Sequence, residues 1–202
     1  MIVAIEGIDG AGKNTLVSAL RERIDAQVIA FPRYGCSIHA QLAAKALHGQ
    51  MGDLTDSIYG MATMFALDRF EAKDELCNFD GVLLLDRYVA SNAAYSAARL
   101  QNDSIADWVY ELEFETLGLP LPDLQVLLDT PVSVAGQRAE SRALQDADRA
   151  RDAYERDGGL QARTADAYQR LASRQWASEW LVAPHDADAG DVAEVILHRF
   201  GM

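Results

Sequence analysis

Gly7 to Thr15 reads GIDGAGKNT and directly follows the apolar run IVAIE. The stretch contains G-x-x-x-x-G-K, in which backbone N–H groups and the start of a helix surround the β-phosphate of a nucleotide while Lys13 reaches the β and γ oxygens. Such a loop requires a strand before it and a helix after it, and the flanking residues predict both. The residues expected to contact the nucleotide are Gly7, Ile8, Asp9, Gly10, Ala11, Gly12, Lys13, Asn14 and Thr15.

The remainder of the chain alternates short apolar runs with longer amphipathic stretches, which is typical of a parallel sheet covered by helices on both faces. Strands are predicted at 2–6, 27–31, 82–86, 124–129 and 180–183. Helices are predicted near 14–24, 38–48, 54–77, 88–100, 104–117, 132–143, 155–175 and 189–199. We therefore expect an α/β P-loop NTPase fold with a five-stranded parallel sheet, in a single domain spanning 1–202.

The formal net charge of −13 over 202 residues argues against binding to a nucleic acid polymer or to an anionic membrane, since both require a basic face. No apolar run approaches the roughly 20 residues that span a bilayer, and MIVAIEG has no basic segment typical of an export signal. The two cysteines, Cys36 and Cys77, could form at most one disulfide. These features favour a cytoplasmic location.

One position of the loop departs from the usual pattern, because Asn14 stands where a Ser or Thr hydroxyl commonly binds Mg²⁺. Mg²⁺ also accepts carboxylates together with phosphate oxygens and water. Asp9 lies inside the loop, and Asp86 ends the apolar run VLLLD, a place where an acid can lie beside the loop. The sequence therefore predicts an Mg²⁺ site that depends on carboxylates.

Three further clusters indicate a second, smaller nucleotide: FPRY at 31–34, FALDR at 65–69 and DRYVASNAAY at 86–95. Together they offer a ring to stack on a base, an amide and an arginine to bind its edge, and arginines for its phosphate. Taken singly, each residue has a structural interpretation, such as Arg69 paired with Asp68 or Glu71 on its own helix. The absence of N-K-x-D disfavours a guanine-binding switch.

With GLPLPD at 118–123 and ARDAYERD at 150–157, these motifs resemble the thymidylate kinase family, and most closely its actinobacterial members. The resemblance implies phosphoryl transfer from ATP to dTMP, giving dTDP and ADP for dTTP synthesis, with Mg²⁺ as cofactor. It also implies a helix-packed homodimer, and the segment 54–77 is indeed more apolar than one buried face requires.

The resemblance also implies roles for individual residues. Phe65 stacks on thymine, Arg69 bonds its edge, Asn92 helps to read the base, and Tyr95 crowds the ribose 2′ position. The other residues expected to contact dTMP are Asp9, Phe31, Pro32, Tyr34, Arg87, Ser91, Asp152 and Tyr154, and Glu155 joins Asp9 and Asp86 as a candidate metal ligand.

Members of the family differ in the source of the arginine that stabilises the transition state, which lies either in the P-loop, where this chain has Gly10, or in a lid. A lid is expected at about 137–152, although its mixed charges alone also fit a solvated helix. Arg138 and Arg149 are expected to contact ATP. The expected catalytic residues are Lys13, Asp9, Arg87 and Arg142.

Two alternatives stay open. A deoxynucleoside kinase phosphorylates a hydroxyl and needs a carboxylate base after the first strand, where Glu6 stands. A catalytically idle nucleotide-binding partner protein would keep the P-loop and lose the acceptor residues, but Arg69, Arg87 and Asn92 are present.

Overall fold

The computed structural model describes residues 1–145, 153–157 and 159–201, without the side chains of 139–145, 155 and 156. Its centre is a parallel sheet with the strand order β2-β3-β1-β4-β5. The strands are β1 (Ile2–Glu6), β2 (Ala26–Ala30), β3 (Val82–Asp86), β4 (Leu124–Asp129) and β5 (Trp180–Pro184). The predicted α/β fold is confirmed, and each strand lies within one residue of its predicted bounds.

Burial explains why short apolar runs form this sheet. All five residues of β1 are buried, and β1 pairs with β3 on one side and with β4 on the other. Ile5 lies opposite Asp86 in this register. Because the strands are parallel, the loop after β1 and the turn after β3 meet at the carboxyl edge of the sheet, which is where ligands bind in such folds.

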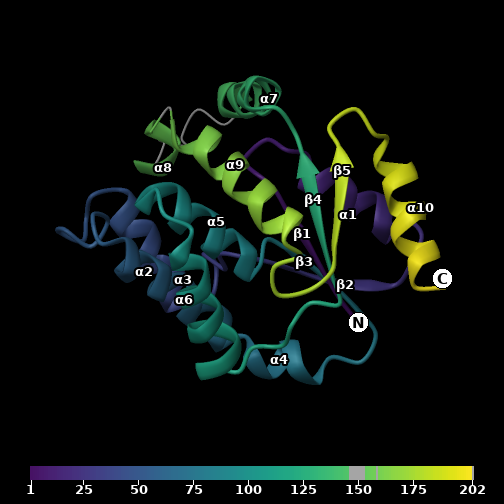
Figure 1. The fold of residues 1–202 in the computed structure, drawn as a ribbon, viewed down its shortest axis with the longest axis horizontal. Helices are drawn as coiled ribbons and strands as arrows, with labels where there is room; N and C mark the ends of the chain where they lie inside the picture. Colours follow the sequence, from purple (N-terminus) through teal and green to yellow (C-terminus); the bar gives the residue numbers. More distant parts are fainter. Residues whose placement is uncertain (146–152, 158, 202) are drawn as a thin grey trace.

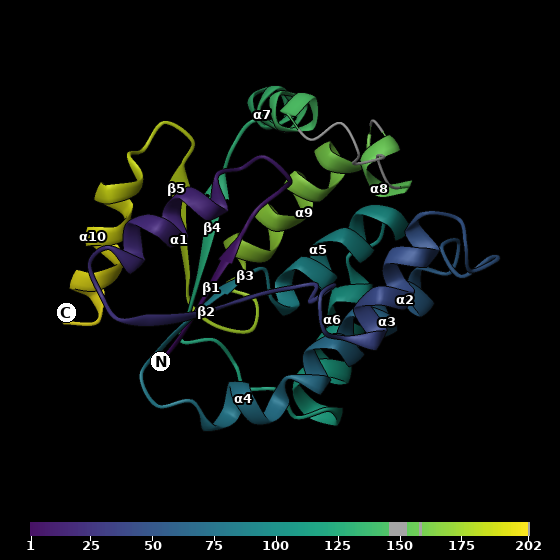
Figure 2. The same ribbon diagram turned by 180° about the vertical axis from the view of Figure 1, so that it is seen from behind.

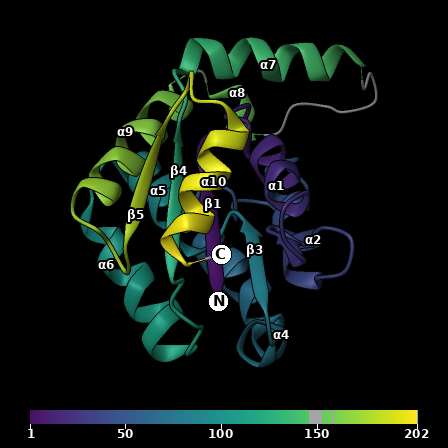
Figure 3. The ribbon, with the colours of Figure 1, turned by 90° about the vertical axis from the view of Figure 1, so that its right-hand side faces the viewer.

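Helices cover both faces of the sheet (Figures 1 and 2). One face is covered by α1 (Lys13–Arg21) and α10 (Ala189–Arg199), and the other by α5 (Val89–Leu100) and α9 (Leu160–Ser173). Beyond α5 lie α2 (Ile38–Leu47), α3 (Ile58–Glu71) and α6 (Ser104–Tyr110). Figure 3 shows α7 (Val132–Gln145) lying across the end of the molecule at which β4 and β5 finish.

Three predicted helices are each divided in the structure. The stretch 54–77 is interrupted at Ala72, which separates α3 from α4 (Lys73–Asn78) and bonds back to Arg69 in the tighter i→i−3 manner. The stretch 104–117 changes from α6 into the π-helical turn η1 (Glu111–Thr116). The stretch 155–175 contains α8 (Ala153–Arg156) and α9, and the side chain of Asp157 accepts from the first N–H groups of α9.

Within the described residues no helix is long and apolar enough to span a bilayer.

Candidate active site

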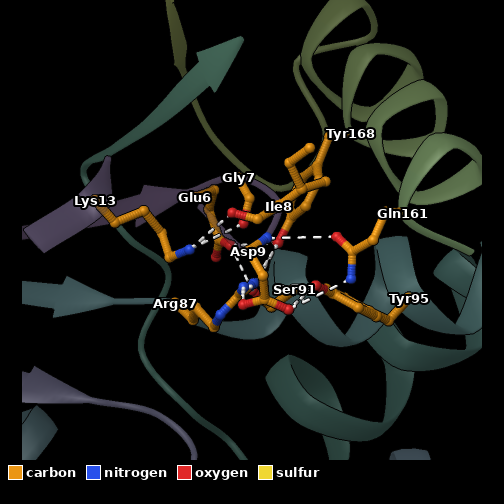
Figure 4. Close-up of polar contacts among 10 residues, drawn as sticks. All are labelled: Glu6, Gly7, Ile8, Asp9, Lys13, Arg87, Ser91, Tyr95, Gln161 and Tyr168. Carbon is orange, nitrogen blue, oxygen red and sulfur yellow. Dashed lines mark hydrogen bonds and ion pairs between the residues drawn. The ribbon is translucent and has the colours of Figure 1, made fainter. Parts of the chain in front are cut away.

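The loop after β1 has the backbone that its glycines permit. Gly10 and Gly12 have φ values of +85° and +103°, a region that side chains disfavour. Lys13 folds back over the loop, and its Nζ donates to the carbonyl oxygens of Gly7 and Ile8 at 3.2 and 3.1 Å (Figure 4). Burial, and next the neighbouring Arg87, lower the pKa of Lys13 to about 8. The loop thus holds its lysine in place before any nucleotide binds.

Gly10 lies directly against the start of α7. A Cβ added at Gly10 would lie 2.2 Å from the carbonyl oxygen of Ala135, far inside an ordinary contact. No side chain fits there without displacing α7. The P-loop therefore has no room for an arginine at this position, and the lid as the source of the transition-state arginine stays a prediction.

Two cavities open at this edge of the sheet. The P-loop cleft, of about 1220 Å³, is lined by Asp9 to Leu16, Asp86, Thr130, Gln137, Arg138 and the segment 184–189 among others. The aromatic cavity, of about 220 Å³, is lined by Pro32, Tyr34, Leu47, Ala62, Phe65, Arg69, Ser91, Asn92, Tyr95, Ser96 and Tyr154. Asp9, Phe31 and Arg87 line both. The two cavities therefore meet at one acidic and one basic side chain.

Asp9 and Arg87 form the ion pair at this junction. Arg87 Nη2 donates to Asp9 Oδ1 at 2.7 Å, and the hydroxyl of Tyr95 donates to Asp9 Oδ2 at 3.1 Å (Figure 4). Partial burial alone raises the pKa of Asp9, but Arg87 and Lys13 outweigh it and hold that pKa well below its usual range. Asp9 is thus an anion at neutral pH.

A buried carboxylate supports Arg87 from behind. Glu6 is fully buried and accepts from the N–H of Tyr88 at 2.8 Å and from the hydroxyls of Ser91 and Tyr168 at 2.6 and 2.9 Å. Arg87 Nη1 in turn donates to the Ser91 and Tyr168 hydroxyls at 3.2 and 3.4 Å. Burial raises the pKa of Glu6, which these donors partly oppose. The network fixes the guanidinium against the floor of the site.

The loop of Phe31, Pro32 and Tyr34 is held to α3 by another buried acid. Asp68 accepts from the backbone N–H of Arg33 at 2.9 Å and from its Nε at 3.1 Å. Arg33 Nη2 also donates to the carbonyl oxygen of Asp68 at 2.7 Å. The loop therefore takes its position from the same helix that carries Phe65 and Arg69.

At the inner end of the aromatic cavity, Arg69 pairs with a residue distant in sequence. Its Nε and Nη2 donate to the two oxygens of Glu113 in η1 at 2.5 and 2.7 Å. The alternative interpretation, that Arg69 pairs with Asp68 or Glu71 on its own helix, is wrong because both of those acids bond to the loop at Arg33 and Ser37. Arg69 and Glu113 are both buried, so the pair is held rigidly.

At the outer end of the cavity, the ring of Tyr95 stacks on Tyr154, with centroids 6.1 Å apart and planes inclined by 15°. Tyr154 accepts a hydrogen bond of 2.6 Å from Arg99. These rings wall the cavity on the side that faces α8.

Comparison with known proteins agrees with this geometry. The family model described as "Thymidylate kinase" matches residues 5–182. The chain belongs to the thymidylate kinase family. It is 51% identical to the thymidylate kinase of Mycobacterium tuberculosis, with 97% of each chain covered, and 30% identical to that of Nitrobacter hamburgensis, with 95% of this chain and 84% of the relative covered. A solved structure of thymidylate kinase from Candida albicans has a TM-score of 0.74 at 19% identity, covering 99% of this chain and 90% of the other, and shares its fold.

Most residues that the sequence predicted for a thymidylate kinase site line one of the two cavities. Gly7 and Ile8 lie behind the loop and contact Lys13, without lining the cleft. Asn14 and Thr15 are exposed and line the cleft. Arg149 and Asp152 lie outside the described residues, as do the side chains of Arg142 and Glu155.

The sequence analysis missed several residues of the site, namely Asp68, Arg99, Glu113, Gln161 and Tyr168. Asp68 stood in a motif that was already recognised, so a buried acid beside the FPRY loop was within reach of sequence reasoning. Tyr168 and Gln161 come from α9. Tyr168 bonds to Glu6 at the end of β1, and Gln161 lies 3.4 Å from both the N–H and Oδ2 of Asp9 in the P-loop. No local pattern indicates such long-range partners.

Proposed function

We propose that this chain transfers the γ-phosphoryl group of ATP to dTMP, giving dTDP and ADP, at the junction of its two cavities. The observation that carries the proposal is that Asp9, Phe31 and Arg87 line the P-loop cleft and the aromatic cavity together. A donor in the cleft and an acceptor in the cavity would then meet end to end beside Arg87. Phosphoryl transfer requires mainly this alignment and the neutralisation of charge.

On the donor side, the N–H groups of the P-loop and the ammonium of Lys13 would bind the β- and γ-phosphates, with Arg138 at the cleft wall. On the acceptor side, Phe65 would stack on thymine, Arg69 and Asn92 would bind its edge, and Arg87 would bind the phosphate. Tyr95 would crowd the ribose 2′ position. We assign transition-state stabilisation to the lid at about 137–152, with Arg142 as its arginine and Arg149 beside ATP.

We propose that Mg²⁺ is the cofactor and that carboxylates compensate for Asn14. Asp86 has one buried oxygen, Oδ1, without a hydrogen-bond partner among the described residues, and it lines the cleft beside Lys13. An acid left in this state fits a cation or its water shell. Asp9, with its side chain 48% exposed, is the second described candidate, and Glu155 is the third. Bound Mg²⁺ would offset the charge of the phosphates.

The metal assignment is tested by replacing the acids separately from Asn14. Asp86→Asn should raise the Mg²⁺ concentration that gives half-maximal rate, and Asp9→Asn should lower kcat sharply while ATP affinity falls little. Asn14→Ser should have a mild effect. A large effect of Asn14→Ser together with full activity of both Asp variants would overturn the assignment.

The deoxynucleoside kinase alternative is disfavoured by the surroundings of Glu6. This carboxylate is fully buried and already accepts from Tyr88, Ser91 and Tyr168, so it lines neither cavity. A base for a substrate hydroxyl must reach that hydroxyl. ADP release measured with dTMP and with thymidine tests the proposal directly. Turnover with thymidine and none with dTMP would refute it, and no turnover with either would favour the idle partner protein.

We further propose a single-domain subunit that forms a homodimer in the cytoplasm. Ile38 on α2 and Tyr59 and Phe70 on α3 expose 56%, 46% and 43% of their surface, which is a high share for such side chains. The exposed free thiols of Cys36 and Cys77 suit a reducing compartment. Light scattering at micromolar concentration tests the assembly, and a strictly monomeric species would contradict it.

A further inference from the structure

Glu113 is a charged residue in a place that usually excludes charge. It lies in the π-helical turn η1 and is fully buried, and among the described residues its carboxylate accepts hydrogen bonds only from Arg69 and Asn92. Burying a carboxylate is costly unless hydrogen bonds compensate it. Its compensation comes from two residues that line the aromatic cavity, Arg69 and Asn92.

The contact with Asn92 determines how that amide is oriented. Asn92 Nδ2 donates one proton to Glu113 Oε1 at 2.7 Å and the other to the carbonyl oxygen of Ala62 at 2.9 Å. A flipped amide would place its oxygen against these two acceptors and lose both bonds. The orientation is therefore fixed by these two bonds. Among the described residues, Oδ1 accepts only a long hydrogen bond of 3.4 Å from the Ser96 hydroxyl, which leaves one of its lone pairs for a further donor.

The contact with Arg69 has a complementary result. Nε and Nη2 are both occupied by Glu113, while Nη1 has no hydrogen-bond partner among the described residues. Burial alone lowers the pKa of Arg69, but Glu113 outweighs it, so the guanidinium stays charged and cannot become an acceptor. The two residues that Glu113 binds thus offer the aromatic cavity an acceptor, Asn92 Oδ1, and a donor, Arg69 Nη1.

We infer that Glu113 is a positioning residue that sets the donor and acceptor polarity of the base site, and through it the choice of pyrimidine. Thymine and uracil present an N3–H donor beside an O4 acceptor, which matches this pair. Cytosine presents an unprotonated N3, which would face the acceptor Asn92 Oδ1, and an amino group, which would face the donor Arg69 Nη1. Glu113 reaches the base through Asn92 and Arg69 and does not touch it. The inference deepens the proposed function and rests on it.

Glu113→Gln is the informative change because it keeps the shape and replaces one acceptor oxygen by a donor. The new N–H group must face a donor of Asn92 or Arg69, and one of the two bonds is then lost. The Asn92 amide becomes free to flip, or the Arg69 guanidinium becomes free to turn. The ratio of kcat/KM for dTMP to that for dCMP should fall at least about tenfold, because a hydrogen-bonding site discriminates through groups left unpaired. KM for ATP should stay within about twofold. Glu113→Asp keeps two acceptor oxygens and should restore part of the ratio.

Asp103→Asn is the matched control. Asp103 also forms a two-point pair with an arginine, Arg170, at 2.7 and 2.9 Å, but its side chain is 46% exposed and it lines neither cavity. The control should leave the dTMP to dCMP ratio unchanged. A Glu113→Gln variant that keeps the wild-type ratio, while folded by circular dichroism, would overturn the inference.

A measurement on the unaltered protein covers the case in which Glu113→Gln does not fold. In ¹⁵N-labelled protein without substrate, both side-chain amide protons of Asn92 should be protected from exchange, and they should keep their contacts to Glu113 and Ala62 when dTMP is added. Amide protons that exchange freely, or that turn toward the base, would overturn the inference. Failure of the wild-type protein to phosphorylate dTMP would instead refute the proposed function, and the amide measurement would still decide the orientation of Asn92.

Discussion

Gly10→Ala should damage both stability and turnover, because Gly10 joins the P-loop to α7. Its φ of +85° costs an L-residue about 1–2 kcal/mol. The added Cβ would also lie 2.2 Å from the Ala135 oxygen, and overpacking of this kind costs about 1–3 kcal/mol. The free energy of unfolding should therefore fall by about 2–5 kcal/mol, the sum of the two contributions.

Gly49→Ala separates the two contributions. Gly49 has a similar φ of +75°, but a Cβ added there meets nothing within 4 Å. The free energy of unfolding of Gly49→Ala should fall only by the backbone cost of about 1–2 kcal/mol. Urea unfolding of both variants measures the difference, which reports the contact between the loop and Ala135.

Turnover provides the second readout. Relief of the contact would move the start of α7, and with it Gln137 and Arg138, which line the P-loop cleft. A displacement of about 1 Å can lower a rate about 100-fold, so kcat of Gly10→Ala should fall strongly while Gly49→Ala stays near wild type. Equal losses of stability in the two variants, with kcat unchanged in both, would refute the reasoning.

Three further predictions follow from other contacts. Lys13 has a pKa of about 8 before ATP binds, and bound phosphates stabilise its ammonium, so ATP binding at pH 8 should take up about half a proton. Calorimetry in buffers of different ionisation enthalpy should detect this uptake. An absence of uptake would contradict the buried state of Lys13. Asp68→Asn should release the Arg33 loop and raise KM for dTMP about tenfold. Glu71→Gln, on the same helix, keeps an oxygen that can accept from the Ser37 hydroxyl and should change KM little, and equal effects would argue that Asp68 is not the main anchor of the loop. Tyr95→Phe should lower the preference for dUMP over UMP about tenfold in competing-substrate assays, and an unchanged ratio would exclude the hydroxyl from ribose selection.

The parts of the structure that sequence predicted are those that local patterns encode. IVAIE and VLLLD are short, apolar and followed by turn residues, so their strands were found to the residue, and GIDGAGKNT carries its own geometry in its glycines. The breaks at Ala72 and at η1 were missed because no proline marks either one. A periodic pattern continues through such breaks without a change in composition.

The site was predicted less completely, and Glu113 illustrates why. Glu113 stands among other acidic residues in ELEFETLG, a pattern that predicts an exposed side chain because isolated buried carboxylates are rare. Its partners, Arg69 and Asn92, lie 44 and 21 residues away, so no spacing rule connects them. The pairing is visible only once α3, α5 and η1 are packed together.

The charges of the described site are the physical reason for proposing a lid. Lys13 and Arg87 are its cations at the junction, and Asp9 and Asp86 are carboxylates beside them, so the described junction is close to neutral. Two phosphate-bearing substrates would bring several negative charges to this point, on a chain whose net charge is already −13. In the proposed mechanism, the additional positive charge would come from a bound cation and from the arginines that follow Gly136, of which Arg138 lines the cleft. A site assembled in this way would gain its full positive charge only when both substrates and the proposed lid are in place, which would disfavour transfer of the phosphoryl group to water.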